Sequence, residues 1–114
     1  MVIVYGIPNC DTMKKARKWL NDNGIEYRFH DYKKQGLDET LLRTWVDDIG
    51  WETLMNRRGT TWRKLPEAVR DRIDEDTAIR VMLKNPSIIR RPVLESDGHH
   101  HIGFSEQAYQ ELLL

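Results

Sequence analysis

With 114 residues, the chain is long enough for one domain with a sizeable core and too short for two ordinary ones, so we expect a single domain over residues 1–114. Its 18 lysines and arginines balance 18 aspartates and glutamates, which offers no basis for a nucleic-acid or membrane-surface partner. No apolar run approaches the roughly 20 residues that cross a bilayer, no signal-type segment opens the sequence, and the one cysteine cannot form an internal disulfide. We therefore expect a cytoplasmic protein, and we expect it to be a monomer.

The first third of the chain predicts a strand, a helix and a second strand. Val2–Tyr5 is apolar on both faces, which is typical of a strand in the middle of a sheet. Apolar side chains recur at helical spacing over Asp11–Asn23, and Gly24 follows as a C-terminal cap. Ile25–His30 alternates apolar and polar residues, as a strand with one buried face does.

The middle of the chain shows only helical periods. We predict one helix from Asp38 to Gly50, a short piece over Trp51–Met55, a helix that begins at Pro66, and another that is capped by Asp74 or Asp76. This pattern indicates a helical insertion over about residues 38–85.

The last part of the chain returns to strands. Ile88-Ile89 and Pro92–Leu94 are apolar, and an Asp97-Gly98 turn before His100–Phe104 is a strong hairpin signal. Ser105 then caps a closing helix. The order of elements predicts an α/β protein with a thioredoxin-like fold, in which an all-helical insertion follows the second strand.

Cys10 is the candidate nucleophile, because it lies between the first strand and the first helix. Backbone N–H groups and the helix dipole favour an anion there, so a thiolate can form at neutral pH. A lone cysteine can instead be a small buried core residue, but its polar neighbours Asn9, Asp11 and Thr12 argue against that. Met13 occupies the second position of a two-cysteine redox motif, so an outside thiol must complete any disulfide chemistry.

Arginines could supply positive charge to this site. In a thioredoxin-like fold a cis proline lies beside the cysteine, so Arg91, which precedes Pro92, can face the thiolate or an anionic ligand. The alternative is a solvated arginine before an edge-strand proline. Arg58 lies in a basic segment that could bind an oxyanion or could simply be solvated.

Three consecutive histidines, His99 to His101, do not predict a metal site. Neighbouring residues on a strand point to opposite faces, so at most two of these side chains share a side, and no third ligand is evident. We expect no metal.

Three segments, Pro8–Lys14, Arg58–Leu65 and Asn85–Pro92, together resemble the arsenate reductase (ArsC/Spx/YffB) family, most closely its YffB-type branch. The resemblance covers essentially the whole chain. It implies a thioredoxin-like domain with a helical insertion and Cys10 as nucleophile. It also implies that Arg58 and Arg91 bind oxyanions and that Lys14 supports the thiolate.

On this resemblance we expect a glutathione-dependent thiol reductase. Cys10 would attack the substrate, Arg58 and Arg91 would hold an anionic group or a glutathione carboxylate, and glutathione would resolve the adduct. The residues expected to line the substrate site are Asn9, Thr12, Lys14, Arg58, Arg91 and Pro92.

Two other functions of the family stay open. The first is arsenate reduction, but Gly103 stands where arsenate reductases of the family carry a third site arginine in an Arg-Pro-Ser-Glu segment. The second is an Spx-like regulator that binds RNA polymerase. Regulators of that type often use a two-cysteine switch, which Met13 denies here.

Overall fold

The computed structural model describes residues 1–114 and contains two compact units. One unit consists of Met1–Gly36 and Arg91–Leu114, and the other consists of Leu37–Arg90. No helix in either unit combines the length and the apolar character needed to cross a membrane. The expectation that the whole chain is one domain stays a prediction.

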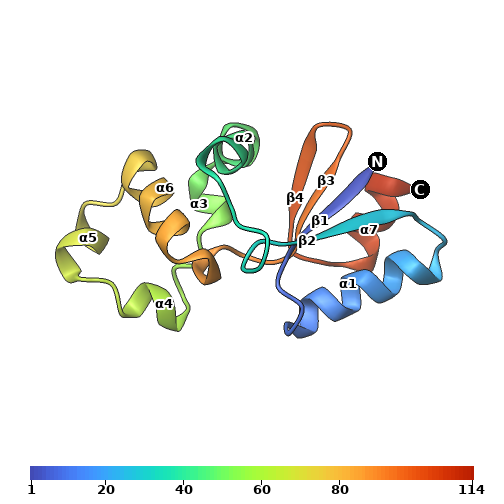
Figure 1. The fold of residues 1–114 in the computed structure, drawn as a ribbon, viewed down its shortest axis with the longest axis horizontal. Coiled ribbons are helices and arrows are strands. Elements are labelled where there is room, and N and C mark those ends of the chain that lie inside the picture. The colour runs from blue at the N-terminus through green and yellow to red at the C-terminus, as the bar shows by residue number, and fades with distance from the viewer. The chain divides into compact units, whose positions relative to one another are not determined.

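A four-stranded sheet forms the centre of the first unit, in the order β2-β1-β3-β4 (Figure 1). The strands are β1 (Val2–Gly6), β2 (Tyr27–Asp31), β3 (Val93–Ser96) and β4 (His99–Ile102). β1 pairs parallel with β2 and antiparallel with β3, and β3 pairs antiparallel with β4. β1 thus has the central place that its apolar run predicted, because β2 and β3 pair with it on its two sides.

The register decides which chain segments meet. Gly6 at the end of β1 pairs with Asp31 at the end of β2, and Tyr5 pairs with Val93 at the start of β3. The carboxyl ends of two parallel strands and the amino end of an antiparallel strand therefore lie at one edge of the sheet. The loops that leave or enter the sheet at this edge carry the candidate site.

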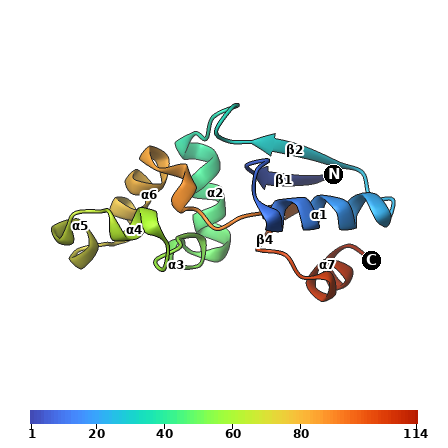
Figure 2. The ribbon, with the colours of Figure 1, turned by 90° about the horizontal axis from the view of Figure 1, so that it is seen from below.

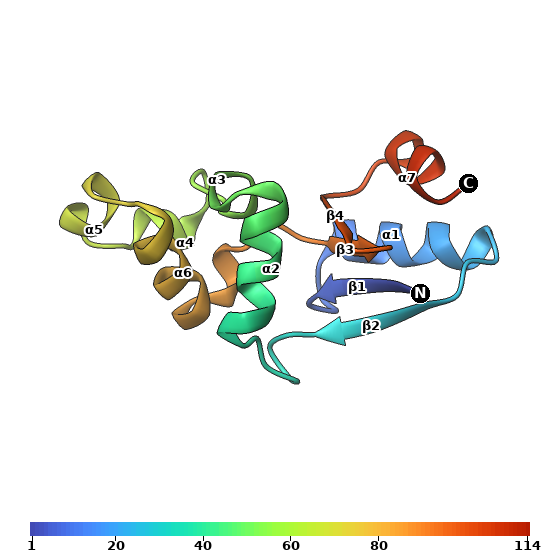
Figure 3. The ribbon, with the colours of Figure 1, turned by 90° about the horizontal axis from the view of Figure 1, so that it is seen from above.

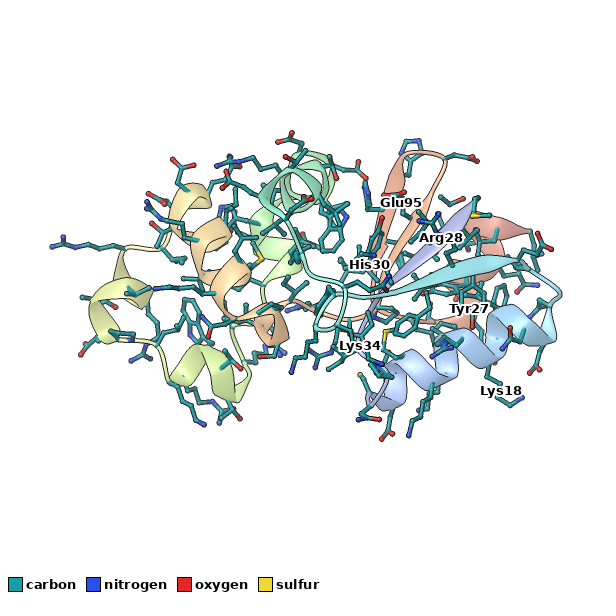
Figure 4. The ribbon with its side chains drawn as sticks, in the orientation of Figure 1. Lys18, Tyr27, Arg28, His30, Lys34 and Glu95 are labelled. Carbon is teal, nitrogen blue, oxygen red and sulfur yellow. The ribbon has the colours of Figure 1, made fainter.

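Two helices, α1 (Asp11–Asp22) and α7 (Glu106–Leu113), lie side by side against one face of the sheet (Figures 2 and 3). Side chains of β2 alternate between the two faces, so that Tyr27 points toward α1 while Arg28 points away from it (Figure 4). The buried core between the helices and the sheet consists of Val2, Val4, Met13, Ala16, Leu20, Leu94 and Tyr109. This core holds the start of α1 against the end of β1.

The second unit contains only helices. They are α2 (Glu39–Ile49), α3 (Trp51–Leu54), α4 (Thr60–Arg63), α5 (Glu67–Asp71), α6 (Glu75–Lys84) and the 3-10 helix η1 (Pro86–Ile88). The carboxylates of Asp38 and Asp74 cap α2 and α6 by accepting hydrogen bonds from Leu41 N–H at 2.7 Å and Thr77 N–H at 2.9 Å. Both starts match the sequence prediction, because side-chain oxygens satisfy N–H groups that the helix leaves unpaired.

Two strand predictions need correction. Ile88 ends η1, and Ile89 makes only an isolated bridge with Met55, so this pair is not a strand. Both isoleucines are buried among helices, where an apolar pair needs no partner strand. The second strand of the hairpin was predicted over His100–Phe104, but β4 begins at His99 and ends at Ile102. It ends there because the backbone of Gly103 turns away from an extended conformation, with φ +81°.

Candidate functional site

Three residues come together at the loop edge of the sheet in the first unit. Cys10 follows β1, Tyr32 directly follows β2, and Arg91 lies two residues before the start of β3. The pairing of Tyr32 N–H with the Gly6 carbonyl, at 3.2 Å, continues the contact between the two parallel strands by one residue. The strand register thus places all three residues at the place where α1 begins.

Cys10 is the N-cap residue of α1 and is partly exposed. Its backbone is extended, with φ −121° and ψ 129°, and its carbonyl accepts the first helical hydrogen bond from Lys14 N–H at 3.0 Å. No side-chain hydrogen bond of regular geometry caps the helix. The Cys10 sulfur therefore lies beside the N–H groups that a serine or an aspartate would pair at this position.

The surroundings of Cys10 favour its thiolate form. Partial burial alone would raise the pKa of the thiol, but the Met13 N–H, the Arg91 guanidinium and the Thr12 N–H outweigh it and lower that pKa below its ordinary value. The main cause of the lowering is thus the helix start, and Arg91 adds a full positive charge. A larger fraction of Cys10 is ionised at neutral pH than of a free cysteine.

Arg91 is half-buried and enters β3 through a cis peptide bond to the buried Pro92. Burial alone would lower the pKa of its guanidinium, but the Cys10 sulfur and the Tyr32 hydroxyl raise it, so Arg91 keeps its charge. The structure confirms the predicted cis proline, and it places Arg91 against the thiol rather than in solvent.

Tyr32 was not predicted as a site residue. It is 1% exposed, and burial raises the pKa of its hydroxyl to about 12 although the nearby Arg91 guanidinium lowers it. No motif in the surrounding sequence marks it, so only its position directly after the second parallel strand could have drawn attention to it.

The other residues predicted in the first unit lie around the start of α1. Asn9 and Lys14 are exposed, and Thr12 is partly buried. Thr12 contributes its backbone N–H to the sulfur environment. Side-chain roles of Asn9, Thr12 and Lys14 in substrate binding stay predictions.

Arg58 belongs to the second unit, where its side chain is exposed. Its backbone is held on both sides, because its N–H donates to Asn56 Oδ1 at 3.0 Å and its carbonyl accepts from Arg63 Nη2 at 2.6 Å. The loop before α4 is therefore ordered within its own unit. The role of Arg58 in oxyanion binding stays a prediction.

The histidine run lies on β4 with alternating directions. His100 Nε2 lies within hydrogen-bond distance of Glu95 Oε1 across the hairpin, at 3.1 Å, and all three histidines line a cavity of about 130 Å³. Nowhere in residues 1–114 do three or more histidine, cysteine, aspartate or glutamate side chains gather as metal ligands would.

Comparisons with known proteins follow the same pattern as the fold. A model of the ArsC family matches residues 5–112. The solved structure of the YFFB (PA3664) protein is 50% identical, covers all of both chains and has a TM-score of 0.95. An arsenate reductase (ArsC) related protein from Brucella melitensis is 54% identical over 99% of this chain and 95% of that chain, with a TM-score of 0.81. The global transcriptional regulator Spx of Streptococcus mutans is 30% identical over 99% of this chain and 83% of the length of that regulator. These likenesses confirm the predicted thioredoxin-like fold.

Proposed function

The chain belongs to the ArsC family, and from this premise we propose that it is a glutathione-dependent thiol reductase with Cys10 as its nucleophile. The observation that carries the proposal is the pairing of Cys10 with Arg91 at the start of α1. A thiolate is the reactive form of cysteine toward disulfides, and a fixed cation beside it can also hold a carboxylate of an anionic thiol compound.

The proposed reaction has three thiol–disulfide exchange steps. The Cys10 thiolate attacks one sulfur of a disulfide substrate, forms a mixed disulfide and releases the other sulfur as a thiolate. A first glutathione thiolate attacks the Cys10 sulfur of this adduct, releases the second substrate thiolate and leaves a disulfide between Cys10 and glutathione. A second glutathione thiolate attacks the glutathione sulfur of that disulfide, frees Cys10 as a thiolate and leaves oxidised glutathione. The two electrons that reduce the substrate disulfide thus come from glutathione.

Met13 supports the need for an outside thiol. It lies one turn into α1, where a two-cysteine motif would place the resolving thiol, and it is fully buried. The sequence contains no cysteine besides Cys10, so no second thiol of the chain can release the adduct.

Intact-mass measurement with oxidised glutathione tests the proposal. We expect the protein to gain the mass of one glutathionyl group and to keep it until a free thiol is added. The rate should rise with pH and reach half its maximum below about 8.5, the pKa of an ordinary cysteine, because the thiolate is the attacking form. The Cys10→Ser variant is the control and should gain nothing. Wild-type protein that stays unmodified would rule the glutathione mechanism out.

The likeness to Spx favours a second candidate, a regulator that binds RNA polymerase. It predicts stable co-purification with RNA polymerase that does not depend on Cys10. Retention of polymerase by both wild type and Cys10→Ser, with no glutathione adduct, would put this candidate first.

A further inference from the structure

Tyr32 is anchored at the site by its backbone. Its N–H donates to the Gly6 carbonyl at 3.2 Å, and Gly6 ends the strand that leads into the Cys10 loop. Arg91 lies at the same end of the sheet, two residues before β3, which pairs with β1 on the side opposite β2. Tyr32 therefore lies at the same end of the sheet as Cys10 and Arg91, at a position that the pairing of three strands determines.

The Tyr32 hydroxyl has an unusual environment. It is buried and forms no hydrogen bond of regular geometry with the protein, yet it lies near the Arg91 guanidinium and within electrostatic reach of Cys10 and Asp31. A buried hydroxyl without such a bond is destabilising, so its presence needs a physical reason. At neutral pH the hydroxyl keeps its proton, because burial raises its pKa to about 12. Its oxygen therefore presents a neutral dipole, whose negative end is attracted to a guanidinium.

We propose that Tyr32 is a positioning residue of this site, whose hydroxyl oxygen holds the Arg91 guanidinium against the Cys10 sulfur. An arginine side chain has many rotamers, and a half-buried guanidinium stabilises a thiolate only while it stays close to it. The pairing of β3 with β1 sets where the Arg91 backbone lies, and Tyr32 restrains the end of its side chain. This inference deepens the proposed function, and it rests on that function only for what the thiolate does afterwards.

Tyr109 offers a matched comparison within the same unit. It is also fully buried, and its hydroxyl also lacks a hydrogen bond. Its ring packs against Trp19, Phe104 and His101, and burial is the one cause that raises the pKa of its hydroxyl, with no contribution from a charged neighbour. The Tyr109→Phe variant thus also loses a buried hydroxyl, but it leaves the surroundings of Arg91 unchanged.

The experiment compares wild type, Tyr32→Phe, Tyr109→Phe, Arg91→Ala and the double variant Tyr32→Phe/Arg91→Ala. Alkylation of Cys10 is followed against pH with neutral iodoacetamide and with anionic iodoacetate. We expect Tyr32→Phe to raise the pKa read from the profile and to slow alkylation at pH 7 by about three- to tenfold, the range for one polar contact. The ratio of the iodoacetate rate to the iodoacetamide rate should fall as well, because a well-placed Arg91 attracts the anionic reagent. Tyr109→Phe should match wild type, and Tyr32→Phe should change nothing further once Arg91 is alanine.

Two results would overturn the inference. One is a Tyr32→Phe protein with the wild-type pH profile and reagent preference. The other is an equal effect of Tyr32→Phe with and without Arg91, since the hydroxyl would then not act through the guanidinium. Neither readout uses glutathione, so a protein that forms no glutathione adduct would refute the proposed function and leave this inference standing.

Discussion

At the scale of single residues, Gly6 and Met13 shape the wall of the site beside Cys10. A Cβ atom on Gly6 would collide with the end of the Met13 side chain, so a larger residue there would force that side chain to move. Met13 fills the space where a second thiol would stand in a two-cysteine motif. The position of a resolving cysteine is thus taken by Met13, whose apolar side chain packs against Gly6.

Gly103 decides our expectation for arsenate. It stands where the resemblance places a third oxyanion-binding arginine, and its N–H donates to the Pro92 carbonyl at 2.9 Å, next to Arg91. We expect weak or no arsenate reduction in an assay of glutathione oxidation. Gly103→Arg should gain part of this activity while losing about 1–2 kcal/mol of stability, because φ is +81° there.

Gly98→Arg is the control for that gain. Gly98 has a similar backbone, with φ +78°, and has open space around it at the hairpin turn. It should lose stability without gaining arsenate reduction. A wild-type protein that reduces arsenate as fast as an established arsenate reductase would contradict the expectation.

At the scale of elements, α1 differs from the other long helices in how it begins. Asp38, Asp74 and Ser105 cap α2, α6 and α7 with side-chain oxygens, whereas Cys10 stands at this position in α1. The helix start therefore directs its unpaired N–H groups toward the sulfur instead of toward a permanent oxygen acceptor. The same groups that would stabilise the helix through a cap stabilise the thiolate here.

This difference predicts the stabilities of two inactive variants. Cys10→Ser should be about 1 kcal/mol more stable to urea than Cys10→Ala, because serine caps the helix in the extended backbone conformation that Cys10 already has. Ser105→Ala should lose a similar amount, since the Ser105 hydroxyl accepts from Ala108 N–H at 3.1 Å. Equal stabilities of Cys10→Ser and Cys10→Ala, with a loss at Ser105→Ala, would show that α1 needs no cap.

At the scale of the whole molecule, the expected oxyanion-binding residues come from two units. Arg91 belongs to the unit that contains the sheet, and Arg58 belongs to the helical unit. The resemblance assigns oxyanion binding to each of these arginines, and we predict that Arg58 contributes to the recognition of a charged substrate. Glutathione provides the test, because it carries carboxylates that an arginine can bind.

Arg58→Ala should slow adduct formation by oxidised glutathione about three- to tenfold more than adduct formation by uncharged 2-hydroxyethyl disulfide. Arg57→Ala is the matched control, because Arg57 is a neighbouring exposed arginine whose guanidinium lies 5.4 Å from the Trp51 ring centroid. It should change the two rates equally. If Arg58→Ala also leaves their ratio as in wild type, Arg58 does not bind glutathione carboxylates.

Local patterns determined much of this protein. The apolar run of β1, the spacing of α1, the Asp97-Gly98 turn and the start of α7 at Ser105 were predicted correctly, because each depends on residues close together in the sequence. The position of Cys10 before a helix likewise followed from local order. The predicted strand at Ile88-Ile89 was wrong, because an apolar pair has the same appearance in a strand and in a helical core.

Only the tertiary structure decided which residues surround the sulfur. Arg91 faces Cys10 because β3 pairs antiparallel with β1. Tyr32 lies at the same end of the sheet because β2 pairs parallel with β1 in a register that puts Asp31 opposite Gly6, so that the next N–H, of Tyr32, donates to the Gly6 carbonyl. No local pattern carries that information, since strand pairing joins segments far apart in the chain. The sequence alone thus predicted Cys10 as the nucleophile, while the register of the sheet determined the charged and polar groups around its sulfur.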